Sequence, residues 1–351
     1  LGTQAGQRCL RRKISQGGMS MPWVIFVVSA GVIAFAAMQL AKYGDIIALR
    51  TGLGGMFVGV LLMAGATSLP EVLTSVSSLR LGVPNLAAGN LLGSNMFNMF
   101  LLAVLDMAFF NQRILRNALL RHALSGSLAI FLISLAIFFI MANFQVTIGW
   151  IGLDSLALMV VYLGAIGLIQ SNLSHSTKNL ESPKIEIPAG MPKLITGLIG
   201  FLIAAGVLVG VTPYLVSSSN QIAEITGLGT TFVGTTLVAL VTSLPELATT
   251  LAAAKIGAVD MAIGNLFGSN MFNIFALGLT DLFLTSGRFL EIIDPVFLLV
   301  AVLGLLMTGL ALIGIIARLE RRIFFLEIDA FILIVLYFGG LVFLYNRGIG
   351  G

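Results

Sequence analysis

Long apolar stretches alternate with short polar segments along nearly the whole chain. Each apolar stretch has about 20 or more residues, the length that an α-helix needs to cross the hydrocarbon core of a bilayer. We therefore expect an all-α integral membrane protein with ten transmembrane helices. They are predicted near residues 22–48, 52–79, 84–110, 118–141, 147–171, 194–216, 227–254, 258–284, 292–317 and 327–346.

The two halves of the chain repeat each other at an offset of 175 residues. Residues 52–107 align with 227–282 without a gap, and 28 of the 56 positions are identical. The offset also holds outside this segment, where it pairs Asp154 with Asp329. The repeat is therefore a whole half of the protein, five helices long.

An odd number of helices per repeat means that the second repeat must enter the membrane from the opposite side. We predict two inverted five-helix repeats over residues 22–171 and 194–351, with a polar linker at 172–193 and an N-terminal tail at 1–21. Transporters with this architecture bind their substrate near the membrane midplane, between the repeats.

Composition supports this fold class and excludes others. Hydrophobic residues make up 58% of the chain and charged residues 10%, with a mean hydropathy of +1.05, whereas soluble domains carry about 25% charge. The single cysteine, Cys9, excludes an internal disulfide framework. The histidines, His122 and His175, fall in predicted polar loops, so we expect no imidazole metal cluster.

The distribution of basic residues predicts the orientation. The net charge is +4, and the Lys and Arg residues lie in loops between the predicted helices. This distribution indicates membrane orientation and not binding to a nucleic acid. One side has only Arg80, Arg288 and Arg347, apart from the N-terminal tail. We therefore expect a protein of the cell membrane with both termini outside and the linker in the cytoplasm. The twelve residues on the predicted cytoplasmic side are Lys42, Arg50, Arg113, Arg116, Arg121, Lys178, Lys184, Lys193, Lys255, Arg318, Arg321 and Arg322.

The tail conflicts with this orientation, because it places four basic residues on the predicted external side. A native start at Met19 or Met21 is the hypothesis that removes the conflict.

Two acidic residues inside apolar stretches are the strongest functional signal. Glu71 and Glu246 occupy the same position in the two repeats, in the segments ATSLPE and VTSLPE. A carboxylate at bilayer depth costs roughly 2.5–3.5 kcal/mol or more, so it marks a functional site by default. Pro70 and Pro245 break the helix pattern one residue earlier. We expect this to free backbone carbonyls around residues 64–67 and 239–242 as ligands.

A second repeated segment follows, GNLLGSNMFN at 89–98 and GNLFGSNMFN at 264–273. A serine and an asparagine lie one helical turn apart on one face in each copy. They are Ser94 and Asn98 in the first copy, and Ser269 and Asn273 in the second. We interpret Gly89, Gly93, Gly264 and Gly268 as close-packing positions, and Asn90, Asn95, Asn265 and Asn270 as structural amides that bridge helices.

The candidate ligands are all oxygen atoms: carboxylates, hydroxyls, amide oxygens and backbone carbonyls. Such a set fits hard cations such as Na⁺, Ca²⁺ and Mg²⁺, and flexible mixed ligation favours Ca²⁺ over Mg²⁺. Two carboxylates also neutralise one divalent ion.

These paired motifs resemble the α-repeats of the cation/calcium antiporter superfamily, the sodium/calcium exchangers and their prokaryotic relatives. The resemblance covers both repeats. It implies that Glu71 and Glu246 coordinate Ca²⁺ together with the carbonyls of Thr67 and Thr242. It also implies overlapping Na⁺ positions at Ala64, Ala239, Ser68, Ser243, Ser94, Ser269, Asn98 and Asn273.

The sequence departs from the family pattern at two places. Ala66 and Val241 stand where many relatives have glycine, and Asn273 stands where some prokaryotic and potassium-dependent members have aspartate. The site therefore holds two carboxylates and not three, which puts K⁺ coupling and proton coupling through a third acid in doubt. Asp154 and Asp329 fit a structural role near helix N-termini, which we favour over ion binding. Two roles stay open for Asp106 and Asp281, the lining of an ion vestibule and a contact at a helix end.

We therefore expect a secondary antiporter that exchanges Ca²⁺ for Na⁺, with three Na⁺ per Ca²⁺ implied by the resemblance. The nearest alternative is exchange of H⁺ for Ca²⁺, or for another divalent cation, through the same two glutamates. A passive channel fits less well, because a single carboxylate pair favours occlusion. The sequence contains no motif that supports an intramembrane enzyme. Ca²⁺, Na⁺ and the lipid bilayer are the expected partners, with no cofactor, nucleic acid or obligate protein partner.

Overall fold

The computed structural model describes residues 20–51, 65–109, 121–177, 192–255, 259–285, 287–317, 322–323 and 326–349. Several predictions lie outside these residues: most of the N-terminal tail, Ala64, Arg113, and the first half of the helix predicted at 52–79.

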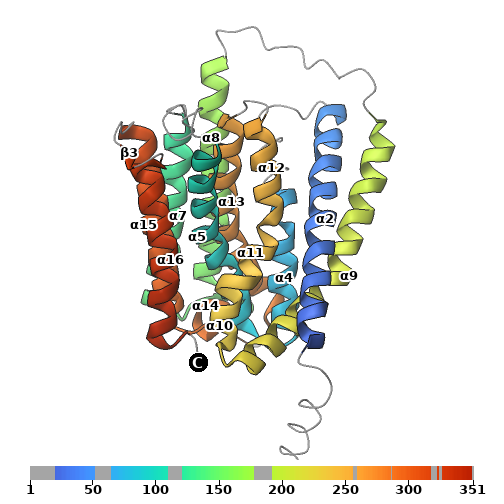
Figure 1. Ribbon diagram of the computed structural model, residues 1–351, viewed down its shortest axis with the longest axis vertical. Helices are drawn as coiled ribbons and strands as arrows, with labels where there is room; N and C mark the ends of the chain where they lie inside the picture. The colour runs from blue at the N-terminus through green and yellow to red at the C-terminus, as the bar shows by residue number, and fades with distance from the viewer. Residues whose placement is uncertain are drawn as a thin grey trace, which may run out of the picture.

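The described part of the chain is helical almost throughout (Figure 1). The first half contains α2 (Ser20–Thr51), α4 (Leu69–Arg80), α5 (Pro84–Ala108), α7 (Arg121–Ala142), β1 (Thr147–Ile148), β2 (Ile151–Gly152) and α8 (Leu153–Thr177). The second half contains α9 (Leu194–Thr226), α10 (Gly229–Val233), the π-helix η1 (Gly234–Val238), α11 (Ala239–Thr242), α12 (Leu244–Lys255), α13 (Val259–Leu279), the 3₁₀-helix η2 (Thr280–Phe283), α14 (Phe289–Ile292), α15 (Phe297–Ala317), β3 (Arg322–Ile323), β4 (Leu326–Glu327), α16 (Ile328–Leu344) and the π-helix η3 (Tyr345–Ile349).

The membrane-spanning character of the helices is confirmed. Eight helices of the described residues are long and apolar enough to cross a bilayer, and a ninth span is a pair bent by 42° between Gly229–Thr242 and Leu244–Lys255. The tenth predicted helix, 52–79, is described only from residue 65 onward.

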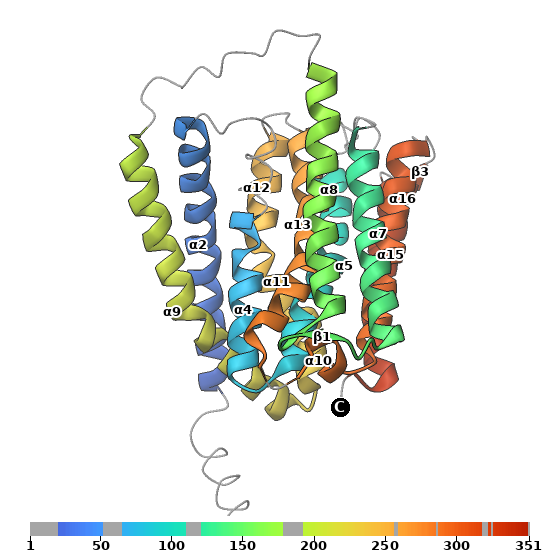
Figure 2. The ribbon, with the colours of Figure 1, turned by 180° about the vertical axis from the view of Figure 1, so that it is seen from behind.

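The two halves run in opposite directions. In Figures 1 and 2, α2 begins at the bottom of the molecule, whereas its counterpart α9 begins at the top. The hairpin of β1 lies at the bottom and that of β3 at the top, and the C-terminus lies at the same end as the start of α2. This is the inverted arrangement that five helices per repeat predict.

The predicted separation of basic residues also follows the two ends. Arg50 and Lys255 lie in the last turns of α2 and α12, which end at the top of Figure 1. Arg80 and Arg347 lie in the last turns of α4 and η3, which end at the bottom. Which end faces the cytoplasm stays a prediction from the positive-inside rule.

A short hairpin replaces the predicted start of one helix. Residues 147–152 were expected to be helical, but β1 and β2 pair antiparallel around Gly149, which has φ +67°. Glycine tolerates this left-handed conformation, so a two-residue turn forms there. The second hairpin, β3 and β4, has the same register at an offset of 175 residues.

The predicted loop positions of the histidines are wrong. His122 lies in α7, is 7% exposed, and its Nε2 is 2.8 Å from Oδ1 of Asp260 at the start of α13. α8 continues to Thr177, so His175 is also helical. Both residues sit in polar helix ends, which hydropathy alone does not separate from loops.

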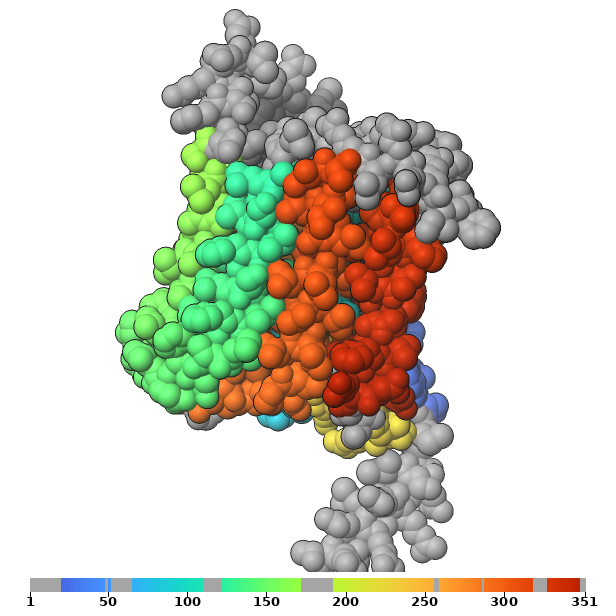
Figure 3. Space-filling model, turned by 90° about the vertical axis from the view of Figure 1, so that its left-hand side faces the viewer, coloured from blue at the N-terminus to red at the C-terminus, as the bar shows by residue number. Residues whose placement is uncertain are grey.

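The core has two parts. The larger apolar cluster joins α5, α7, α8, α13, α15 and α16, and the smaller joins α2 and α9 with the segments around the helix breaks. Figure 3 shows α8, α7, α15 and α16 side by side on one face. Exposed Phe138, Val160, Leu306 and Phe338 lie on these helices, as expected for a lipid-facing surface.

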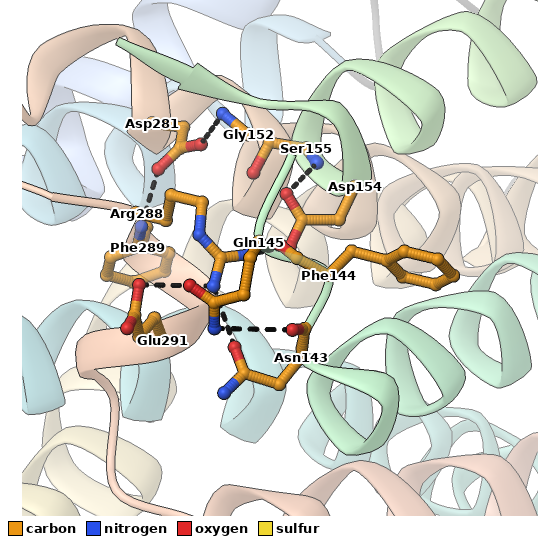
Figure 4. Close-up of polar contacts among 10 residues, drawn as sticks. All are labelled: Asn143, Phe144, Gln145, Gly152, Asp154, Ser155, Asp281, Arg288, Phe289 and Glu291. Carbon is orange, nitrogen blue, oxygen red and sulfur yellow. Dashed lines mark hydrogen bonds and ion pairs between the residues drawn. The ribbon is translucent and has the colours of Figure 1, made fainter. Parts of the chain in front are cut away.

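Polar contacts join the two halves at the bottom end (Figure 4). The guanidinium of Arg288 is 3.1 Å from the carboxylate of Asp154 at the start of α8. Asp281 in η2 accepts hydrogen bonds from the backbone N–H groups of Gly152 and Phe289. The helix-start role predicted for Asp154 is confirmed, and Asp329 likewise accepts the Ala330 N–H at 2.9 Å. Of the two roles left open for Asp281, these contacts favour the one at a helix end.

Close approach of α5 to η1 confirms the packing role of two glycines. A Cβ added at Gly89 would lie 2.8 Å from the backbone nitrogen of Thr235, and one at Gly93 would lie 2.7 Å from its Cα. η1 is a π-helix where Thr235 and Thr236 donate their hydroxyls to carbonyls four residues back. A Cβ added at Gly264 would lie 3.5 Å from Cε1 of the His122 ring, its nearest described neighbour, which is an ordinary van der Waals distance.

We predict that Gly93→Ala destabilises the protein by about 1–3 kcal/mol, because the methyl group meets backbone that cannot move aside. Thermal unfolding in detergent, followed by size-exclusion chromatography, measures the loss. Gly164→Ala is the matched control, since an added Cβ on that exposed glycine of α8 has no neighbour within 4 Å. Equal stability of the two variants would contradict the close packing.

Candidate ion-binding site

In both halves the helix breaks just before the proline of the repeated motif, as the sequence predicts. Ser68 precedes α4 with φ −88° and ψ 7°, and Ser243 separates α11 from α12 with φ −88° and ψ 6°. Proline has no N–H to donate and crowds the preceding turn, so the helix cannot continue through it. The break lies near the middle of the span from Gly229 to Lys255. The backbone angles at the two serines are nearly equal, so the same local distortion occurs in each half.

The two carboxylates converge between the halves. Glu71 and Glu246 follow these breaks directly and are 1% and 0% exposed. Ser68 donates its hydroxyl to Oε1 of Glu246 at 2.9 Å. Ser243 donates to Oε1 of Glu71 at 3.2 Å. Each glutamate is therefore held by the serine at the break of the opposite half, which brings both broken helices to one place.

The second oxygen of each carboxylate remains available. Oε2 of Glu71 and Oε2 of Glu246 are buried and accept no hydrogen bond from any described residue. No described Lys, Arg or His forms a salt bridge with either glutamate. An unpaired buried carboxylate is expensive, so two of them together favour a bound cation.

The serines of the second motif lie beside this pair. Ser269 donates its hydroxyl to Oε1 of Glu246 at 3.4 Å. Its counterpart Ser94 is fully buried, and its hydroxyl has no hydrogen-bond partner among the described residues. The ligand roles that the family resemblance implies for both serines stay predictions.

The two asparagines at the ends of the second motif, Asn98 and Asn273, have side-chain oxygens that are not used in hydrogen bonds with described residues. Asn98 donates its amide N–H to Asn270, and Asn273 donates its amide N–H to Asn95, each at 3.0 Å. Their own oxygens, Oδ1 of Asn98 and Oδ1 of Asn273, are buried and accept no hydrogen bond from described residues. The bridging role predicted for Asn95 and Asn270 is confirmed.

Asn90 ties the two broken helices together through α5. Its Nδ2 donates to the backbone carbonyl of Glu71 at 3.0 Å and to Ser75 Oγ at 3.2 Å. Its Oδ1 accepts the hydroxyl of Thr242, on the other half, at 2.8 Å. Asn90 therefore fixes both sides of the site and confirms its predicted structural role.

Asn265, the counterpart of Asn90, is less tightly held. Its Nδ2 lies 3.2 Å from Thr249 Oγ1 and 3.3 Å from Thr250 Oγ1. Both hydroxyls donate to the carbonyl of Glu246. The sequence interpretation missed these supporting hydroxyls. The repeat offset was the available signal, because it pairs Ser75 with Thr250.

One predicted ligand is not free in the structure. The Ala239 carbonyl was expected to lose its partner, but it accepts the N–H of Ser243 at 3.0 Å and the hydroxyl of Thr242 at 3.3 Å. The Ala239 carbonyl therefore stays within the hydrogen-bonded part of the helix. Ala64 lies outside the described residues, and Thr67 and Thr242 are fully buried beside the carboxylates.

A polar site between inverted repeats of membrane helices is the arrangement of many secondary transporters. Comparison with known proteins agrees. The family model described as sodium/calcium exchanger protein matches residues 21–169 and 196–346, one match for each half. The chain belongs to this family, whose members are transporters and not enzymes.

Two relatives and one solved structure illustrate the similarity. An uncharacterized membrane protein of Methanocaldococcus jannaschii is 30% identical over 249 residues, covering 68% of this chain and 74% of that protein. The sodium/calcium exchanger MaX1 of Methanosarcina acetivorans is 27% identical, covering 76% and 84% respectively. The crystal structure of the H⁺/Ca²⁺ exchanger CAX has a TM-score of 0.65 at 13% identity, covering 98% of this chain and 92% of that chain.

We predict that Asn90→Ala destabilises the protein more than Asn265→Ala. Loss of Asn90 leaves the Glu71 carbonyl and the Thr242 hydroxyl without this partner, at a cost of about 1–3 kcal/mol. Among the described residues, Asn265 contacts two hydroxyls of its own half, whereas Asn90 joins a backbone carbonyl of one half to a hydroxyl of the other. Chemical or thermal unfolding of the two variants in the same detergent provides the comparison. A larger loss for Asn265→Ala would contradict the assigned asymmetry.

Proposed function

We propose that the protein is a secondary antiporter that exchanges Ca²⁺ for Na⁺ at a single site between the two repeats. The observation that carries this proposal is the reciprocal pairing of Ser68 with Glu246 and of Ser243 with Glu71. It joins one carboxylate from each half in a buried site whose remaining oxygens are unpaired among the described residues. Both ions compete for these oxygens, and alternating access exposes the site to one side at a time.

The chemistry of the site supports Ca²⁺ as one substrate. Carboxylate, hydroxyl and amide oxygens are ligands of hard cations, and their mixture suits the variable coordination of Ca²⁺. Two carboxylates balance the charge of one Ca²⁺ or of two Na⁺. The proposed direction is Ca²⁺ out of the cytoplasm, driven by Na⁺ entry across the cell membrane, with both termini outside.

Exchange of H⁺ for Ca²⁺ is the second candidate. The similarity to the structure of an H⁺/Ca²⁺ exchanger supports it, because the proteins similar to this chain include that exchanger as well as a sodium/calcium exchanger. Glu71 and Glu246 would then take up the protons. The amides at Asn98 and Asn273 favour Na⁺, since an amide supplies a neutral oxygen to a cation but does not take up or release a proton near neutral pH.

We predict that liposomes containing the protein and loaded with Ca²⁺ release it when Na⁺ is supplied outside. Release of calcium-45 measures the flux under imposed Na⁺, K⁺ or H⁺ gradients. Flux driven by a pH step without Na⁺ would instead select H⁺ coupling, and ion currents without a counter-ion would indicate a channel.

Glu71→Gln and Glu246→Gln should each reduce this exchange by at least about tenfold, because each removes one of the two charges that balance Ca²⁺. Glu224→Gln is the matched control, since Glu224 is an exposed residue of α9. Exchange that survives both site substitutions would contradict the proposed ligands.

We further predict that the exchange is electrogenic. Three Na⁺ per Ca²⁺, the ratio that the family resemblance implies, moves one net charge per cycle. Such a step responds to voltage by about 2.3 kcal/mol per 100 mV. A K⁺ gradient with valinomycin sets the potential in the liposomes, and reversing its sign should reverse the effect on the initial rate. A rate independent of potential would exclude this ratio.

A further inference from the structure

Four buried asparagines lie together where α5 crosses α13. Asn95 and Asn98 belong to α5, Asn270 and Asn273 belong to α13, and none is more than 2% exposed. Asn98 Nδ2 donates to Asn270 Oδ1, and Asn273 Nδ2 donates to Asn95 Oδ1, both at 3.0 Å. The two bonds are related by the repeat offset, so each half holds the amide of the other.

The direction of these bonds matters for cation binding. A primary amide has an acceptor oxygen at one end and a donor NH₂ group at the other. Rotation by 180° exchanges the two at almost no steric cost, and only the hydrogen-bond partners decide between them. An NH₂ group directed at a cation repels it. In Asn98 and Asn273, the NH₂ group is engaged and the oxygen is left for a ligand.

One of the two holding residues, Asn270, is itself fixed by a second hydrogen bond. Asn270 uses its own Nδ2 to donate to the backbone carbonyl of Asn95 at 3.3 Å, which directs its Oδ1 toward Asn98. The Asn95 side chain has one bond among the described residues, the one that it accepts from Asn273. Replacement of Asn95 therefore removes the support of Asn273 and no other hydrogen bond of the described side chains.

We propose that Asn95 and Asn270 are positioning residues, which fix Asn273 and Asn98 with their amide oxygens toward the transported cation. The inference rests on the proposed function, because it requires an ion at this site. It assigns to the two asparagines a role in ion affinity beyond helix packing.

A double-mutant cycle tests this role. Asn95→Leu, Asn273→Ala and the combined variant are placed in liposomes, and the Ca²⁺ concentration for half-maximal Na⁺-dependent exchange is measured for each. Asn95→Leu should raise this concentration roughly five- to tenfold, with little change in maximal rate, because the Asn273 amide is free to turn. In the Asn273→Ala background, Asn95→Leu should have no further effect, since the group that it orients is absent.

Equal effects of Asn95→Leu in both backgrounds would overturn the inference, because they indicate packing alone. An unchanged affinity in Asn95→Leu would overturn it as well. Wild-type protein without Na⁺-dependent exchange would instead overturn the proposed function. Thr308→Val is the control for removal of a buried polar group, since the Thr308 hydroxyl donates to the Gly304 carbonyl of its own helix and to no other described residue. If Asn95→Leu does not fold, the same cycle with Asn270→Leu and Asn98→Ala decides the question.

Discussion

The structure depends on the burial of two carboxylates inside an apolar helix bundle. Such groups are tolerated only where other atoms supply charge or hydrogen bonds. Here each carboxylate obtains part of that support from the opposite half, through Ser68 and Ser243. The helix breaks, the polar face of α5 and the close approach of η1 are all arranged around these bonds. Neither half alone contains a complete set of partners.

The two halves are related in sequence but are not equivalent in their contacts. Asn90 bonds directly to the carbonyl of Glu71, whereas Asn265 reaches the carbonyl of Glu246 only through Thr249 and Thr250. Ser269 bonds to a carboxylate and its counterpart Ser94 does not. An inverted repeat therefore gives the same set of side chains on both sides of the site, while each side keeps its own pattern of bonds. The two carboxylates therefore differ in the hydroxyls that donate to them.

Much of this was predictable from the sequence, because the signals are local. Proline breaks a helix by its own covalent geometry, and a glutamate in an apolar segment is recognisable in the sequence. The breaks before Glu71 and Glu246 could therefore be predicted from the sequence alone. The contacts between halves did not follow, because the repeat offset shows which residues are equivalent and not which ones touch. The hairpin at Gly149 was missed because its apolar residues continue the hydropathy of the next helix. The occupied Ala239 carbonyl was missed because the exact turn at which a helix breaks depends on tertiary packing.

The hairpins that precede α8 and α16 keep one register although their sequences differ, as TIGWIG and RIFFLE. Their persistence points to a five-helix ancestor that already possessed them. The bond between Asn98 and Asn270 and the bond between Asn273 and Asn95 change places when one half is superposed on the other. Such an ancestor would therefore form a complete site by pairing with an inverted copy of itself. A small chain that inserts in both orientations and dimerises would have sufficed.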